Sequence, residues 1–179
     1  MNRTRIVMPV VVLLLLVPVF SIAGDQDLSP HLKPLAPFLG KTWKGTFSNS
    51  TAEKPMHDVS RWERALNGQA VRILHSVNNG EYGGETLIIW DPARKSLVYY
   101  YFTTAGFYTH GTMTYDDGKF TSYEEVTGNQ NGITAVKATG EILPDGRMRS
   151  RARYLKNGQW VDGHEIIYQE DPTAEVRFH

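Results

Sequence analysis

The segment from Glu85 to Val126 constrains the fold of this chain more than any other stretch. It contains four runs rich in aromatic and β-branched residues, which is the composition of half-buried strands. The linkers between the runs carry turn residues and are too short to cross over to a parallel partner. The segment therefore predicts four successive antiparallel strands, at residues 85–90, 97–103, 107–115 and 120–126.

Strand-like runs continue on both sides of this segment. Asn67-Gly68 and Pro144-Asp145-Gly146 are typical of tight β-hairpins. About ten strands joined by short turns predict an all-β fold, an antiparallel up-and-down barrel whose closure removes exposed sheet edges. A β-sandwich is the alternative, but it needs a long crossover that the sequence lacks. The additional strands are expected at residues 42–48, 56–66, 69–77, 133–143, 148–155 and 159–169.

A proline-rich segment precedes the first expected strand. Pro30 suits the first position of a helix, while Pro34 and Pro37 limit that helix to one or two turns. We expect this short N-terminal helix to close one end of the barrel, with a functional lid as the alternative. The leucines at helical spacing are Leu28, Leu32, Leu35 and Leu39. At the other end of the chain, an irregular tail is expected after Pro172.

The amino terminus has the pattern of a secretory signal peptide. Arg3 and Arg5 precede an apolar run at residues 6–20, and small residues up to Ala23 suit signal peptidase. The run is shorter than the roughly 20 apolar residues that a membrane-spanning helix needs, so a retained anchor is the weaker alternative. We expect residues 1–23 to be a signal peptide cleaved near Ala23, and residues 24–179 to form one secreted or periplasmic domain without a membrane span.

Composition excludes some classes of partner. The full chain has 19 basic and 19 acidic residues, and the expected cleavage removes two arginines and no acid. The resulting slightly acidic protein lacks the excess positive charge that neutralises nucleic-acid phosphates, so no nucleic-acid partner is expected. Because the chain has no cysteine, its stability must come from the packed core alone.

Alternation along the expected strands selects the side chains that face the interior. They form an aromatic set with several polar groups, as in pockets that bind small molecules. Because an unpaired buried charge is costly, we hypothesise that Arg64 pairs with Glu124 or Glu165 near His75, either as a hook for a carboxylate or phenol or as a structural ion pair. The expected ligand-binding residues are Trp62, Arg64, Ile73, His75, Trp90, Tyr99, Tyr101, Met113, Glu124, Tyr154 and Glu165.

No residue is assigned a catalytic or metal-binding role. The histidines lack the close spacing of zinc ligands, and neither a Gly-X-Ser-X-Gly elbow nor a cysteine supplies a nucleophile. One phenol of the run Tyr99–Tyr101 could transfer a proton, with packing as the alternative. Outside the barrel, a row of arginines is expected on the solvated face, with an anion site as the alternative. An outer aromatic patch suggests a partner surface or a homodimer contact, and comprises Tyr100, Phe102 and Tyr108.

Residues 35–45, Leu-Ala-Pro-Phe-Leu-Gly-Lys-Thr-Trp-Lys-Gly, resemble the start of calycin-type barrels, where a short helix precedes a glycine and a tryptophan on the first strand. Trp90-Asp91-Pro92 and a last strand with Trp160 and Tyr168 resemble exported bacterial calycin-like barrels of unassigned function. The chain is also similar to lipocalin, fatty-acid-binding and nitrobindin-like barrels, although it carries one residue more than the Gly-X-Trp of lipocalins. The resemblance implies a small hydrophobic molecule held inside the barrel.

The sequence leaves three functions to distinguish. The leading one is an exported, soluble barrel that binds a small hydrophobic or amphipathic ligand without a cofactor and without converting it. The second is an isomerase, cyclase or hydrolase acting through His75, Glu124 or a tyrosine in the same cavity. The third is implied by the nitrobindin-like resemblance and is haem binding by His75 or His164, although the expected register places His164 outside.

Overall fold

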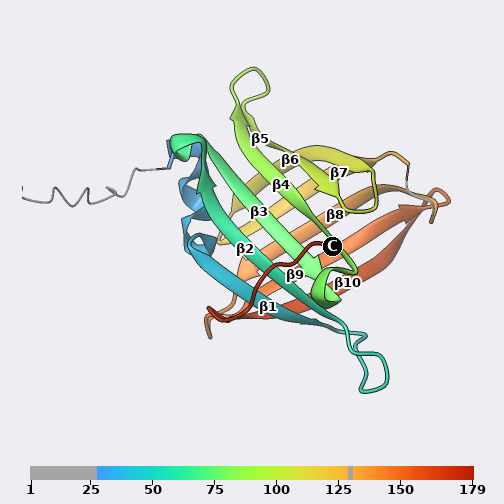
Figure 1. Ribbon diagram of the computed structural model, residues 1–179. Coiled ribbons are helices and arrows are strands. Elements are labelled where there is room, and N and C mark those ends of the chain that lie inside the picture. Colours follow the sequence, from blue (N-terminus) through green and yellow to red (C-terminus); the bar gives the residue numbers. More distant parts are fainter. Residues whose placement is uncertain (1–27, 129–130) are drawn as a thin grey trace, which may run out of the picture.

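The computed structural model describes residues 28–128 and 131–179, so the expected signal peptide lies outside the described residues. Ten antiparallel strands form a closed barrel in which neighbours in sequence are neighbours in space, and β1 pairs with β10 to complete it (Figure 1). The predicted all-β up-and-down barrel is confirmed. Its strands are β1 (Lys41–Phe47), β2 (His57–Ala65), β3 (Ala70–Val77), β4 (Tyr82–Asp91), β5 (Ser96–Thr103), β6 (Tyr108–Asp116), β7 (Lys119–Val126), β8 (Ile133–Ile142), β9 (Met148–Lys156) and β10 (Gln159–Glu170).

Tight turns set the register of the strands as the sequence predicted. Trp62 lies opposite Ile73 across β2 and β3, and Tyr101 lies opposite Thr109 across β5 and β6. The β9–β10 turn uses Asn157 and Gly158 with φ of 52° and 76°, the left-handed pair that matches the twist of a hairpin. Single turns of 3-10 helix, η2 (Leu66–Gly68) and η3 (Asn78–Gly80), join β2 to β3 and β3 to β4.

A 3-10 helix, η1 (Pro30–Phe38), closes one end of the barrel, as predicted (Figure 1). Its internal prolines lack the N–H groups that a regular α-helix needs. The leucines at positions 32 and 35 and the ring of Phe38 are fully buried. That ring stacks on Trp62 at 5.0 Å and meets Phe120 edge-on at 5.6 Å. Side chains therefore fill the half of the interior next to η1.

The outer face carries ion pairs between neighbouring strands, as expected for the arginine row. Arg149 pairs with Glu141 of β8, while Arg151 reaches Glu165 of β10 at 2.8 Å. Arg153 of β9 also pairs with Asp162 of β10, whereas Arg147 pairs with Asp145 within the β8–β9 turn.

The tail after β10 is irregular but bound to the barrel. The N–H of Asp171 donates to the carbonyl of Thr42, and the N–H of Arg177 donates to the Ser76 hydroxyl at 3.0 Å. Figure 1 shows the tail, in dark red, crossing the outside of β1 and β2 towards β3. Ser76 is only 2% exposed, which fits a tail that covers this part of β3.

Candidate functional site

The half of the barrel away from η1 contains a cavity of about 730 Å³. Its wall is mainly aromatic and aliphatic, with a few convergent polar groups, which is typical of small-molecule sites. Strand alternation directs these side chains inward, and the turns fix which of them are opposite each other. Of the residues predicted to bind a ligand, those that line the cavity are Trp62, Ile73, His75, Tyr99, Tyr101, Met113, Glu124 and Tyr154.

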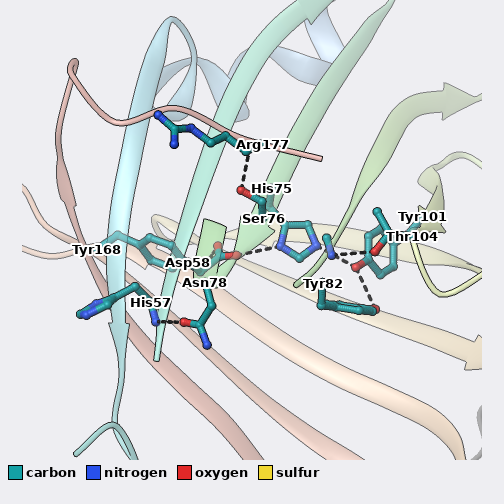
Figure 2. A network of polar contacts seen from close by, with 11 residues as sticks. His57, Asp58, His75, Ser76, Asn78, Tyr82, Tyr101, Thr104, Tyr168 and Arg177 are labelled. Carbon is teal, nitrogen blue, oxygen red and sulfur yellow. Dashed lines mark hydrogen bonds and ion pairs between the residues drawn. The ribbon is translucent and has the colours of Figure 1, made fainter. Parts of the chain in front are cut away.

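A chain of hydrogen bonds crosses the wall from β2 to β5 (Figure 2). Nδ1 of His75 lies 2.8 Å from Oδ1 of Asp58, and Nε2 lies 2.7 Å from the Tyr101 hydroxyl. The Tyr101 hydroxyl is also bonded to that of Tyr82, at 3.0 Å. Both ring nitrogens of His75 are therefore engaged, so the imidazole is held in one orientation between a carboxylate and a phenol.

Asp58 is held from its other side by β10. The hydroxyl of Tyr168 donates to Oδ2 of Asp58 at 2.8 Å, although the whole of β1 lies between their strands. Gly45 of β1 is paired with both residues, and a Cβ built there would lie 2.5 Å from the Tyr168 ring. The missing side chain therefore allows the phenol to cross β1 and reach the carboxylate.

The same device recurs at a second carboxylate. Glu124 of β7 accepts hydrogen bonds at Oε2 from Thr109, at 2.6 Å, and from the Tyr99 hydroxyl, at 3.3 Å. Tyr99 lies on β5, and Gly111 of β6 is the residue paired with both Tyr99 and Glu124. A glycine again lies on the strand between a phenol and an acid two strands away, and a Cβ built at Gly111 would lie 2.9 Å from Cβ of Glu124.

Burial sets the protonation of these groups. It raises the pKa of Tyr82, Tyr99, Tyr101, Tyr154 and Tyr168, so the phenols stay protonated near neutral pH. Burial also raises the pKa of Glu124, although hydrogen bonds from Thr109 and Tyr99 oppose that effect. The cavity therefore offers phenol donors and one carboxyl group for which desolvation disfavours the charged form.

His164 lies in the cavity wall, contrary to the predicted register. Its Nδ1 lies 2.5 Å from the Tyr154 hydroxyl, and burial lowers its pKa, which favours the neutral imidazole. A β-bulge between Asp162 and Glu165 adds one residue to β10 and exchanges its two faces beyond that point. Glu165 consequently pairs with Arg151 outside, and its predicted place in the cavity is wrong.

Arg64 and Trp90 also lie away from the cavity. Both are near the strand ends that η1 covers, where alternation gives the side of the sheet but not the depth. Trp90 stacks on His31 of η1 at 3.7 Å, and exposed Arg64 lines a separate groove beside η1. The predicted pairing of Arg64 with Glu124 or Glu165 is wrong, because each acid has the partners described above.

Sequence reasoning missed four polar residues of the site. Asp58 and Tyr82 occupy the same side of their strands as the predicted lining residues, so alternation alone could have found them. His164 lies in the bulge and Tyr168 follows it; Gly163 in the middle of β10 is the sequence signal that could have indicated this bulge. Trp62, a predicted residue, also lines the cavity. Its indole N–H is buried and has no hydrogen-bond partner within residues 28–128 and 131–179.

The fold and site define a closed ten-stranded antiparallel barrel with a cavity in one half of its lumen. A solved structure of the same architecture is the crystal structure of Rv2717c from M. tuberculosis, with a TM-score of 0.57 and 14% sequence identity over 81% of this chain and 99% of that chain. At this identity the similarity shows the fold alone. No protein-family model and no curated protein sequence matches the chain.

Two features are absent from the described part of the chain. No helix there has the length and apolar character needed to cross a bilayer. Within the same residues, no group of three or more histidine or acidic side chains is arranged to hold a metal ion.

On the outside of β5 and β6, the aromatic patch of Tyr100, Phe102 and Tyr108 is exposed as predicted.

Proposed function

We propose that the barrel binds a small hydrophobic or amphipathic molecule in its cavity without converting it. The observation that carries this proposal is the cavity of about 730 Å³, which has an apolar wall and a few fixed polar groups. The apolar wall would surround the body of the ligand, while Tyr82 and Glu124 would offer hydrogen bonds to its polar atoms. Binding of this kind needs no reactive group, and both nitrogens of His75 are already engaged.

We also propose that the protein acts after export, as its amino-terminal pattern suggests. The intact mass of the protein recovered from its host would test this, because cleavage near Ala23 removes the first 23 residues. A full-length mass would contradict export by this route.

A neutral fluorescent probe, N-phenyl-1-naphthylamine, tests binding in the cavity. Val126 lines the cavity near the end of β7, whereas Glu125 beside it faces outward opposite His110. We expect the probe to bind the unchanged protein and Glu125→Trp alike, and to bind Val126→Trp at least about tenfold more weakly because the indole fills part of the cavity. Absence of binding to the unchanged protein, or equal binding to both variants, would contradict the proposal.

Native mass spectrometry of the protein purified from its own host separates a carrier from an enzyme. A binding protein is expected to retain a small molecule of defined mass, which denaturation releases. An enzyme that releases its product should be recovered without one.

Haem binding is a second candidate, and the position of His164 favours it. The Tyr154 hydroxyl engages Nδ1 of this histidine, which leaves Nε2 as the nitrogen suited to bind iron, and the lowered pKa keeps the imidazole neutral. Added haem should then give a Soret band that is lost in His164→Ala and retained in His57→Ala, whose histidine does not line the cavity. No Soret band with the unchanged protein would remove this candidate.

A further inference from the structure

Two carboxyl groups, those of Asp58 and Glu124, lie in the cavity wall and have different neighbours. Asp58 has His75 as its neighbour at 2.8 Å, and His164 is kept neutral by burial. Among the described residues, the donors that hydrogen-bond to Glu124 are the neutral hydroxyl groups of Thr109 and Tyr99. No lysine or arginine is among the described residues that line the cavity. Of the two carboxyl groups in the cavity wall, Glu124 is therefore the one that has no basic side chain among its described neighbours.

The geometry around Glu124 fits a positively charged group of a ligand. Both protein hydrogen bonds go to Oε2, and a carboxylate can accept further donors at its other oxygen. The cavity wall is rich in aromatic rings, including Tyr82, Tyr101 and Phe107, and aromatic faces attract cations. Burial is the main cause of the raised pKa of Tyr82 and Tyr101, and the charge of Glu124 adds to it.

From this arrangement we infer that the ligand of the cavity is an organic cation, an apolar or aromatic molecule that carries a protonated amine, and that Glu124 is its counter-ion. The inference rests on the proposed function and narrows it to one class of ligand. An unpaired buried charge is unfavourable, and an ammonium group would supply the partner that the protein does not. By the same reasoning, a carboxylate ligand such as a fatty acid would be repelled by Glu124 and would find no arginine or lysine in the cavity wall.

Two matched series of probes test this inference. One has a naphthyl body, as 1-naphthylmethylammonium, 1-naphthylmethanol and 1-naphthoate; the other has a decyl chain, as decylammonium, decanol and decanoate. Affinities are measured by calorimetric titration near neutral pH. We expect the ammonium member of at least one series to bind about tenfold or more tightly than the alcohol, and the carboxylate to bind most weakly.

The isosteric variant Glu124→Gln identifies the group responsible. It should reduce the affinity for the ammonium probe about tenfold, to that of the alcohol, and leave the affinity for the alcohol almost unchanged. Glu125→Gln, one residue away on the outer face, is the matched control and should retain the preference. If Glu124→Gln does not fold, the two series on the unchanged protein still decide whether the cavity prefers a cationic ligand.

The outcomes distinguish this inference from the function on which it rests. Binding of the alcohols without a preference for the ammonium probes overturns the cationic ligand and leaves a cavity that binds neutral molecules. A preference for ammonium that survives Glu124→Gln removes Glu124 as the counter-ion. If none of the six probes binds, both the inference and the proposed function fail.

Discussion

Glu124 lies in the cavity wall among neutral groups. Burial raises its pKa, and the hydrogen bonds from Thr109 and Tyr99 only partly oppose this. A carboxyl group in such surroundings weakens the fold when it is ionised, because desolvation disfavours the charged form. Its position in the cavity wall therefore agrees with the proposed role in binding.

The substitution Glu124→Gln should therefore stabilise the protein in a pH-dependent way. At acid pH, below the usual value of 4.5, the carboxyl is protonated in both the folded and unfolded states, so the free energy of unfolding should be similar to that of the unchanged protein. As the pH rises through the raised pKa, the unchanged protein has to ionise Glu124 in the cavity, and the variant should become the more stable of the two. Urea denaturation across this range measures the difference. A gain that shrinks with rising pH would contradict the assignment.

Glycines on three strands organise the polar part of the cavity. Gly45 on β1 and Gly111 on β6 each lie between a tyrosine and an acid on the strands to either side. Gly84 on β4 has a similar place, because a Cβ there would lie 2.5 Å from the Tyr101 ring, whose hydroxyl reaches His75 of β3. Three phenols thus cross a neighbouring strand where that strand has no side chain.

Gly45→Ala tests this arrangement. The added methyl would lie within 2.5 Å of both the Tyr168 ring and the Ile166 side chain, so the ring must move and its hydrogen bond to Asp58 is expected to break. We expect a loss of about 1–3 kcal/mol in the free energy of unfolding, the usual range for overpacking. Lys44→Ala, at the exposed position on the other side of Gly45, should change it by less than about 0.5 kcal/mol. Chemical denaturation gives both values, and equal stability of the two variants would contradict the account.

The sequence was most informative where tight turns fix which residues are opposite each other. Asn67-Gly68 gave the register of β2 and β3, and so placed Trp62, Ile73 and His75 inside. Prediction from the sequence failed where a strand departs from strict alternation, since the bulge in β10 moves Glu165 out and brings His164 and Tyr168 in. A single extra residue reverses the faces of a strand, and residue preferences alone do not locate it.

Alternation also could not predict how far along the barrel axis each inward-facing residue lies. Trp90 is on the side that faces the interior, yet η1 covers its end of the barrel and the indole stacks on His31. Glycine positions that permit contacts across a strand were also missed, because their meaning depends on which residues lie two strands apart. A sequence pattern thus gave the lining as a set but not the division of the lumen into a packed half and a hollow half.

In the molecule as a whole, the two halves of the barrel differ in how their interior is filled. The half next to η1 is filled by a core that includes Phe38, Phe120 and Met148, while the other half contains the cavity. The C-terminal tail is hydrogen-bonded to the outside of β3. Ligand binding is proposed for the hollow half.

Methyl NMR of the protein labelled with ¹³C-methyl methionine tests the central claim most directly. Met56 and Met113 line the cavity, whereas Met148 lies in the packed half, and substitution of each by leucine assigns the signals. Titration with N-phenyl-1-naphthylamine should shift the signals of Met56 and Met113 through the ring currents of the probe, and should leave that of Met148 in place. Unshifted signals of Met56 and Met113 at saturating probe, or a shift confined to Met148, would contradict a ligand site inside the barrel.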